Sequence, residues 1–257
     1  IEQRIKAKIE AIGTPLKEWN VNIYRGILTG YNDAFIIDKA KKEEILAKCQ
    51  SEEERKKTDE LIRPILRGRD IKRYGYEFAD LYIITTFPSL KIDIELYPAI
   101  KQHLLSFGYD RLKQTGEKGA RKKTNNKWFE TQDSIGYWED FFKEKLLYSE
   151  IVKEPQFFLD KNGQFFAEAT IFIMTGENLE YLYHLLHSKT ITYFFKTFYA
   201  GGGLGGDGYR YKKVFLEKLP IPKPILPISL EENTIENSIY KLYGFSEEEI
   251  KFIKDQK

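Results

Sequence analysis

The stretch KLLYSEIVKEPQFFLDKNGQFFAEATIFIM, Lys145 to Met174, decides the fold class. It contains three runs of the kind found in strands, KLLYSEI, PQFFLD and FFAEATIFIM. The last two runs are joined by Lys161, Asn162 and Gly163, a sequence suited to a tight turn. The stretch therefore predicts neighbouring strands, which form either a second sheet or the continuation of a first one.

Strand-like and helical patterns alternate in the first half of the chain. From Trp19 to Ile37, the alternating run VNIYRGI, the turn sequence LTGYND and the apolar run AFIID together predict a hairpin-like unit. Another strand-like run, LYIITTF, begins at Leu81, and Pro98 suits the first turn of a helix. Because no clear βαβ period is visible, we expect an α+β fold with mixed, mostly antiparallel sheets and flanking helices.

Helices are also expected near the C-terminus. The pattern from Asn178 to Phe198 predicts a helix that breaks near Ser188. A proline-rich run that includes Pro227 must be extended, because proline cannot continue a helix. Two short helices follow, split at Gly244 and restarted by a capping box from Ser246 to Glu249.

These patterns divide the chain into three parts. Residues 1–18, with isoleucines at helical spacing, predict a helical connector. Residues 19–225 form the main domain, as one unit or as two lobes that divide near 140–155. Residues 226–257 predict a short helical tail.

Composition sets broad limits on function. The 257 residues hold 41 Lys and Arg against 39 Asp and Glu, so the net charge of +2 does not by itself indicate a nucleic-acid partner. The single cysteine, Cys49, fits a reducing compartment, and we expect a cytoplasmic protein. No apolar run is long enough to cross a membrane. The start at Ile1, without a methionine, suggests a part of a longer protein.

Motifs of several enzyme classes are absent from the sequence. It contains no G-x-x-x-x-G-K-[ST], H-E-x-x-H or G-x-S-x-G. The histidines His103, His184 and His187 are too few and too scattered to indicate a metal site. The glycine cluster from Gly201 to Gly208 follows a helix, unlike a dinucleotide-binding turn. It predicts either a surface loop or a loop laid against a phosphate backbone.

Two basic segments stand out from the balanced total charge. Arg63 to Tyr74 holds five cations and one acid, Asp70, which we expect to pair with Arg67 or Arg73. Arg111 to Lys127 holds seven cations and one acid and has the composition of a loop. Arginine can read guanine bidentately and lysine can hold phosphates, so both segments suit a DNA-reading surface. The plainer alternative is a solvated surface.

Five segments in order resemble one protein family, the TaqI-like C-terminal specificity domain of type II adenine-N6 methyltransferases, which includes the fused type IIG enzymes. The resemblance covers about residues 15 to 225 and rests on RGILTGYNDAFIID (Arg25 to Asp38), IRPILRGRDIKRY (Ile62 to Tyr74), the Trp128 loop, KLLYSEIVKEPQFFLD (Lys145 to Asp160) and the glycine loop that runs into LEKLPIPKP.

This resemblance implies a target-recognition domain that enters the major groove of double-stranded DNA. A separate methyltransferase domain of the same protein would then flip out adenine and use S-adenosylmethionine, with Mg²⁺ needed if an endonuclease is fused. This chain lacks N-P-P-[YF], since it has no Pro-Pro pair, and it has no Pro-Asp dipeptide for a nuclease centre. We therefore expect no catalytic residues, cofactor or metal in this chain.

Candidate DNA contacts come from four segments. The residues are Thr29, Asn32, Arg67, Arg69, Lys72, Arg73, Lys118, Arg121, Lys122, Lys123, Trp128, Tyr209, Arg210, Lys212 and Lys213. For Thr29 and Asn32 the alternative is a simple turn, and for Trp128 it is a place in the core. Two other functions stay open: a module of a type I specificity subunit, and a protein-interaction domain without nucleic acid.

Overall fold

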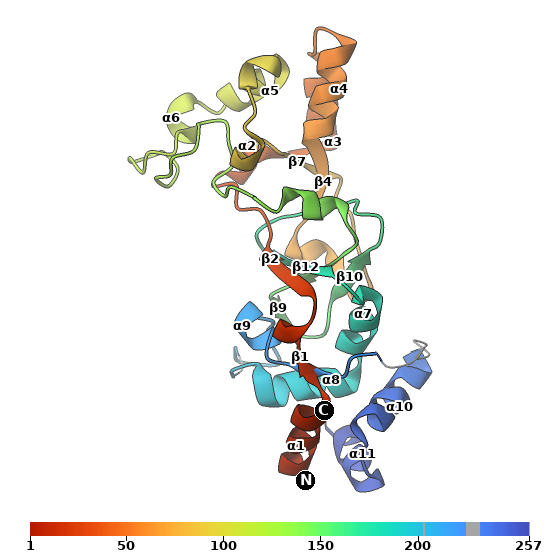
Figure 1. Cartoon of the computed structure of the whole chain (residues 1–257). Coiled ribbons are helices and arrows are strands. Elements are labelled where there is room, and N and C mark those ends of the chain that lie inside the picture. The colour runs from red at the N-terminus through yellow and green to blue at the C-terminus, as the bar shows by residue number, and fades with distance from the viewer. Residues whose placement is uncertain (203, 225–231, 257) are drawn as a thin grey trace.

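The computed structural model describes residues 1–202, 204–224 and 232–256 of the chain. Figure 1 shows an elongated molecule that carries helices at both ends and sheets between them. One end is formed by α3 (Lys39–Ala47), α4 (Glu52–Leu61), α5 (Pro98–Leu105) and α6 (Tyr109–Leu112). At the other end lie α1 (Glu2–Ile12), α8 (Lys189–Phe194), α10 (Glu232–Tyr243) and α11 (Glu247–Lys254). The α+β class is confirmed.

The first sheet is antiparallel throughout and is centred on the stretch that decides the fold. Its order is β10-β8-β12-β2, with β10 (Phe157–Asp160), β8 (Lys145–Ser149), β12 (Ile171–Gly176) and β2 (Val21–Arg25). Leu147 of β8 pairs with Phe158 on one side and with Ile173 on the other. The turn at Lys161 exists, but β10 and β12 flank β8 and do not pair with each other.

The second sheet has the order β11-β4-β7-β3, with β11 (Phe166–Ala167), β4 (Ile62–Leu66), β7 (Leu81–Ile84) and β3 (Ile36–Asp38). Only the β11–β4 pair is parallel. The hairpin expected from Trp19 to Ile37 is wrong, because β2 and β3 belong to different sheets and α2 (Asn32–Phe35) separates them. A division of the chain near 140–155 would not separate the two sheets. Both β11 and β12 follow this region, but β11 belongs to the second sheet and β12 to the first.

The chain passes between the two sheets at Gly26 and Ile27. The Gly26 amide donates to the Ile171 carbonyl, and the Ile27 amide donates to the Ala167 carbonyl, both at 2.8 Å. A Cβ atom on Gly26 would lie 2.1 Å from the Glu168 carbonyl oxygen. Glycine at this position therefore allows the backbones of the two sheets to meet.

Three two-stranded sheets and several short helical turns complete the fold. The small sheets pair β1 (Thr14–Pro15) with β14 (Pro220–Ile221), β5 (Ile71–Lys72) with β6 (Gly75–Tyr76), and β9 (Ile151–Val152) with β13 (Tyr209–Arg210). The turns are η1 (Leu16–Glu18), η2 (Gly68–Asp70), η3 (Pro88–Leu90), η4 (Ile94–Leu96), η5 (Trp138–Phe142) and the π-helical η6 (Phe195–Tyr199). Helices α7 (Leu179–His187) and α9 (Lys213–Leu216) lie near the first sheet.

Local helix signals were predicted well. Ser188 ends α7 and caps α8, and Pro98 occupies the first turn of α5. The capping box from Ser246 to Glu249 begins α11, with both of its hydrogen bonds formed. Pro227 lies outside the described residues.

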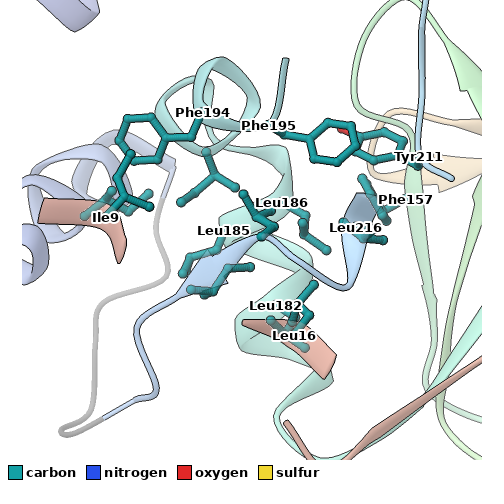
Figure 2. Close-up of a cluster of buried hydrophobic side chains, with 14 of the residues drawn as sticks. Ile9, Leu16, Phe157, Leu182, Leu185, Leu186, Phe194, Phe195, Tyr211 and Leu216 are labelled. Atoms are coloured by element: carbon teal, nitrogen blue, oxygen red, sulfur yellow. The ribbon is translucent and has the colours of Figure 1, made fainter. Parts of the chain in front are cut away.

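The largest hydrophobic core joins α7, the first sheet and both terminal regions. Leu182, Leu185 and Leu186 form one face of α7, and Figure 2 shows them beside Leu16 and Leu216. Ile9 of α1 lies in the same cluster. The expected connector helix is therefore packed into the core of the domain.

Candidate nucleic-acid interface

A loop that follows α6 carries the second basic segment. We call residues 113–127 the tip loop, because it projects from the end of the molecule opposite α1 (Figure 1). Its backbone is tied back on itself: the Gly116 amide donates to the Arg121 carbonyl, and the Arg121 amide donates to the Lys113 carbonyl. Gln114 is buried and donates from Nε2 to the Glu130 carbonyl at 3.0 Å. Internal hydrogen bonds thus hold this polar segment.

Arg121 is the buried centre of this arrangement. Its side chain, in a residue only 2% exposed, donates to the carbonyl oxygens of Leu112 (2.7 Å), Thr29 (2.7 Å) and Trp128 (2.8 Å). Burial lowers the pKa of its guanidinium to about 10. Arg121 was expected to contact DNA, and the structure corrects this expectation: its donors are used inside the protein.

Thr29, Asn32 and Trp128 meet beside Arg121, but they are not equally accessible. Thr29 is fully buried, and its hydroxyl donates to Asn32 Oδ1 at 2.6 Å. Asn32 is exposed at the start of α2. Trp128 is partly buried against Tyr109 and Phe129. We therefore correct the expected contact of the Thr29 side chain with DNA: this side chain stabilises the turn instead.

The lysines of the tip loop face outward. Lys118, Lys122 and Lys123 are exposed, and no carboxylate of the described residues lies within ion-pair distance of them. Lys113 differs, because it pairs with Asp110 and Glu117. Two further basic residues of this segment extend the positive surface: Lys127 is exposed, and the Arg111 guanidinium lies 3.9 Å from the centre of the Tyr31 ring.

The first basic segment runs from β4 through η2 and β5 to the turn before β6. Asp70 accepts from Arg67 Nε (3.0 Å), Nη2 (2.9 Å) and the backbone amide (2.8 Å), so the expected pair forms with Arg67. Burial would raise the pKa of Asp70, but these hydrogen bonds outweigh it and lower the pKa. Since Arg67 is occupied by Asp70, the exposed Arg69 is the freer of the two arginines.

The turn of the β5–β6 hairpin is fixed against α7. His187 accepts at Nε2 from the amides of Tyr74 (3.4 Å) and Phe157 (3.2 Å). Tyr74 has a positive φ of 66°, and its ring lies 4.2 Å from the His187 ring. Arg73 pairs loosely with Glu154 at 3.7 Å, and Lys72 with Glu77 at 3.7 Å.

The residues after the glycine cluster divide between core and surface. Tyr209 is 2% exposed, and burial raises its pKa to about 12. Its expected contact with DNA is therefore corrected to a place in the core. Arg210 is partly buried, Lys212 lies 5.6 Å from the centre of the Phe215 ring, and Lys213 is exposed and pairs with Glu217 at 3.7 Å. Gly203, within the cluster, lies outside the described residues.

The candidate contacts thus fall into two groups. Thr29, Asn32, Trp128 and the tip loop form one group. The other comprises the η2–β6 segment and residues 209–213, which approach each other at Arg73 and Tyr209. A buried ion pair that sequence reasoning missed supports the first sheet: Lys145 Nζ lies 2.6 Å from Asp160 Oδ2, and both residues are buried. Nothing in the strand pattern distinguishes Lys145 from an exposed lysine.

Other kinds of site are not visible in the described part of the chain. Across residues 1–202, 204–224 and 232–256, no three His, Cys, Asp or Glu side chains gather to form a metal site. Within the same ranges, no helix is long and apolar enough to span a membrane.

Comparison with known proteins adds a family and a fold. The family model described as the TaqI-like C-terminal specificity domain matches residues 63–221. No curated protein matches the chain. Similar solved structures include the type IIG restriction endonuclease BpuSI, with a TM-score of 0.57 and 15% identity, and the type IIL restriction-modification enzyme MmeI in complex with DNA, with a TM-score of 0.50 and 13% identity.

These two structures match similar shares of this chain and of their own chains. They cover 99% and 88% of this chain, respectively, but only 28% of either enzyme. At these identities the likeness is one of fold, and the chain spans about a quarter of each enzyme.

Proposed function

Because the chain belongs to the family of TaqI-like C-terminal specificity domains, we propose that it reads the double-stranded DNA target of a type II or type IIG restriction-modification enzyme. The fold shared with BpuSI and MmeI supports this role. We also propose that the chain acts in the cytoplasm, because a DNA-reading domain would meet its target there.

The tip loop is the observation that carries the proposal. Lys118, Lys122 and Lys123 are exposed, and no carboxylate of the described residues lies within ion-pair distance of them, while Arg121 holds the two sides of the loop together. When a loop is already ordered and its lysines are not neutralised by acids, the lysines can bind phosphate oxygens with little loss of conformational entropy. Asn32 and Trp128 border the same loop and can add polar and stacking contacts.

The proposal extends to a parent enzyme with an adenine-N6 methyltransferase domain outside this chain. That domain would be the intramolecular partner and would bind S-adenosylmethionine, with Mg²⁺ required only if an endonuclease is also present. The five segments that resemble the family and the lack of N-P-P-[YF] in these 257 residues support this division. Recognition then belongs to this chain and catalysis to the rest of the protein.

The test is binding of fluorescent duplex DNA by the chain over a range of salt concentrations. We expect the triple variant Lys118→Ala/Lys122→Ala/Lys123→Ala to bind about tenfold more weakly and to reduce the slope of log K against log salt by about 2 to 3, since each lost phosphate contact removes about 0.9. A wild-type chain without salt-dependent binding would refute the proposal.

A matched control removes the same charge elsewhere. Lys17, Lys56 and Lys241 are exposed and lie outside both groups of candidate contacts. The variant Lys17→Ala/Lys56→Ala/Lys241→Ala should retain wild-type affinity and slope. Equal losses in both triple variants would show that net charge, and not the tip loop, governs binding.

A further inference from the structure

A groove of about 840 Å³ lies at the end of the molecule opposite the tip loop. One wall is formed by α8 and η6, and the other by α10 and α11. Residues 153–155 and Arg73, at the turn of the β5–β6 hairpin, also line it. Among the candidate DNA contacts, only Arg73 belongs to this lining.

The lining of the groove has an excess of positive charge. Its two acids are Glu154 and Glu236, and its five cations are Arg73, Lys153, Lys189, Lys196 and Lys254. Glu236 is already occupied, since its carboxylate accepts from the amides of Lys189 (2.6 Å) and Thr190 (3.3 Å). Glu154 pairs with Arg73 at 3.7 Å, which leaves the four lysines in excess of the acids. The groove therefore attracts anions.

Aromatic rings lie beside two of these cations without neutralising them. Lys196 Nζ lies 5.3 Å from the centre of the Tyr209 ring, and Lys254 Nζ lies 5.8 Å from that of Tyr240. A cation over a ring face retains its charge and its N–H donors. The two lysines come from opposite walls, so an anionic ligand between them can reach both.

The chemistry of the groove favours a chain of phosphates over a single nucleotide. A nucleotide site usually gathers its phosphates at a helix N-terminus or in a glycine-rich loop. Here the first amides of α8 are taken by Glu236, which would repel an anion at that point. The cations are instead spread over four segments along the groove.

We propose that this groove binds the phosphodiester backbone of duplex DNA away from the bases that the domain reads. This inference rests on the proposed function and adds a second contact to it. The groove continues the basic surface of the β5–β6 hairpin through Arg73 and lies beside β13 through the contact of Lys196 with Tyr209. Its contacts supply affinity without sequence information.

The test compares Lys189→Ala/Lys196→Ala/Lys254→Ala with wild type in salt-dependent binding to a long duplex. All three lysines are exposed, so folding should be retained, which thermal unfolding checks. We expect a loss of about tenfold and a slope lower by about 2 to 3. Lys17→Ala/Lys56→Ala/Lys241→Ala remains the control, and Lys196→Arg should retain binding.

Photocrosslinking reports the location independently of affinity. In a Cys49→Ser background, a photoreactive group is attached to cysteine at position 196, at 118 or at the control position 56. We expect DNA adducts from positions 196 and 118 and none from 56. If adducts form from position 118 alone and the groove variant binds DNA like wild type, the groove proposal is refuted. The proposed function would then remain intact.

Two further outcomes separate the alternatives. A wild-type chain that binds no DNA would overturn both proposals. The groove is assigned to the wrong ligand if wild type binds ATP, the groove variant loses ATP binding, and both bind DNA equally. Lack of ATP competition against DNA, together with loss of DNA binding in the groove variant, supports the backbone contact.

Discussion

Arg121 Nη1 donates a hydrogen bond of 2.7 Å to the carbonyl oxygen of Thr29, a residue 92 positions earlier in the chain. The same guanidinium also holds the carbonyls of Leu112 and Trp128. One side chain therefore connects the turn after β2, the end of α6 and both sides of the tip loop. The exposed lysines of that loop depend on this connection for their positions.

Replacing Arg121 by Met should destabilise the domain by about 2 to 4 kcal/mol, because the Leu112 and Trp128 carbonyls lose this donor and the Thr29 carbonyl keeps only the Gln132 amide. Lys122→Met, at the adjacent exposed position, should change the free energy of unfolding by less than about 0.5 kcal/mol and still weaken DNA binding. Urea denaturation measures the first effect and duplex binding the second. If the Arg121 variant is as stable as wild type, the structural role of Arg121 is wrong, and Arg121 is again a candidate DNA contact.

His187 should make stability depend on pH. Its Nδ1 faces the Tyr183 carbonyl and its Nε2 accepts from two amides, which requires the neutral ring. Burial lowers its pKa from 6.5 to about 4. Between these values the unfolded chain binds more protons, so stability is full above pH 6.5 and falls toward pH 4.

The loss attributable to His187 is about 3 kcal/mol over that window. His187→Gln should show a flatter dependence of the free energy of unfolding on pH, measured by urea denaturation at several pH values. The pKa values of His103 and His184 are also lowered, so only the difference between wild type and variant isolates His187. Parallel curves for the two proteins would contradict the assignment.

Lys145 and Asp160 should be strongly coupled. Lys145→Met leaves the Asp160 carboxylate buried with only the amides of Gln164 and Phe165 as donors, at a cost of about 3 to 5 kcal/mol. Lys145→Met/Asp160→Asn should recover part of this loss, since no unpaired charge remains. A double-mutant cycle by guanidinium denaturation measures the coupling, and strictly additive effects would refute it.

Gly26→Ala should destabilise the crossing between the two sheets. The added Cβ would lie 2.1 Å from the Glu168 carbonyl oxygen, so backbone must move, at a cost of about 2 kcal/mol or more. Gly75→Ala is the matched control, because apart from its chain neighbours no atom of the described residues lies within 4 Å of its added Cβ. Thermal unfolding should show a lower Tm for the first variant only. A similar Tm for both would show that the crossing is not tightly packed.

Features that depend on a few neighbouring residues were predictable from the sequence. The capping box at Ser246, the break at Ser188 and the start of α5 at Pro98 all involve contacts within one helical turn. The pair between Arg67 and Asp70 spans three residues and was also anticipated. In each case the interacting groups are already close together in the chain.

Strand pairing was less predictable, because its partners are remote. The alternation in β2 identifies a strand, but β12, which pairs with it, begins more than a hundred residues later. The proposed hairpin with β3 failed for this reason. The two-residue alternation of apolar side chains shows which face of a strand is apolar, but it does not show which other strand pairs with it.

Among the candidate contacts, the sequence by itself determined which segments are basic, and the order of five segments determined the family. Only the tertiary structure decided how each cation is used. Arg121 and Lys122 are adjacent and equally charged, yet Arg121 is buried under three carbonyls and Lys122 faces solvent. The carbonyls that make this distinction come from residues 29, 112 and 128, so the folded chain alone brings them to one guanidinium.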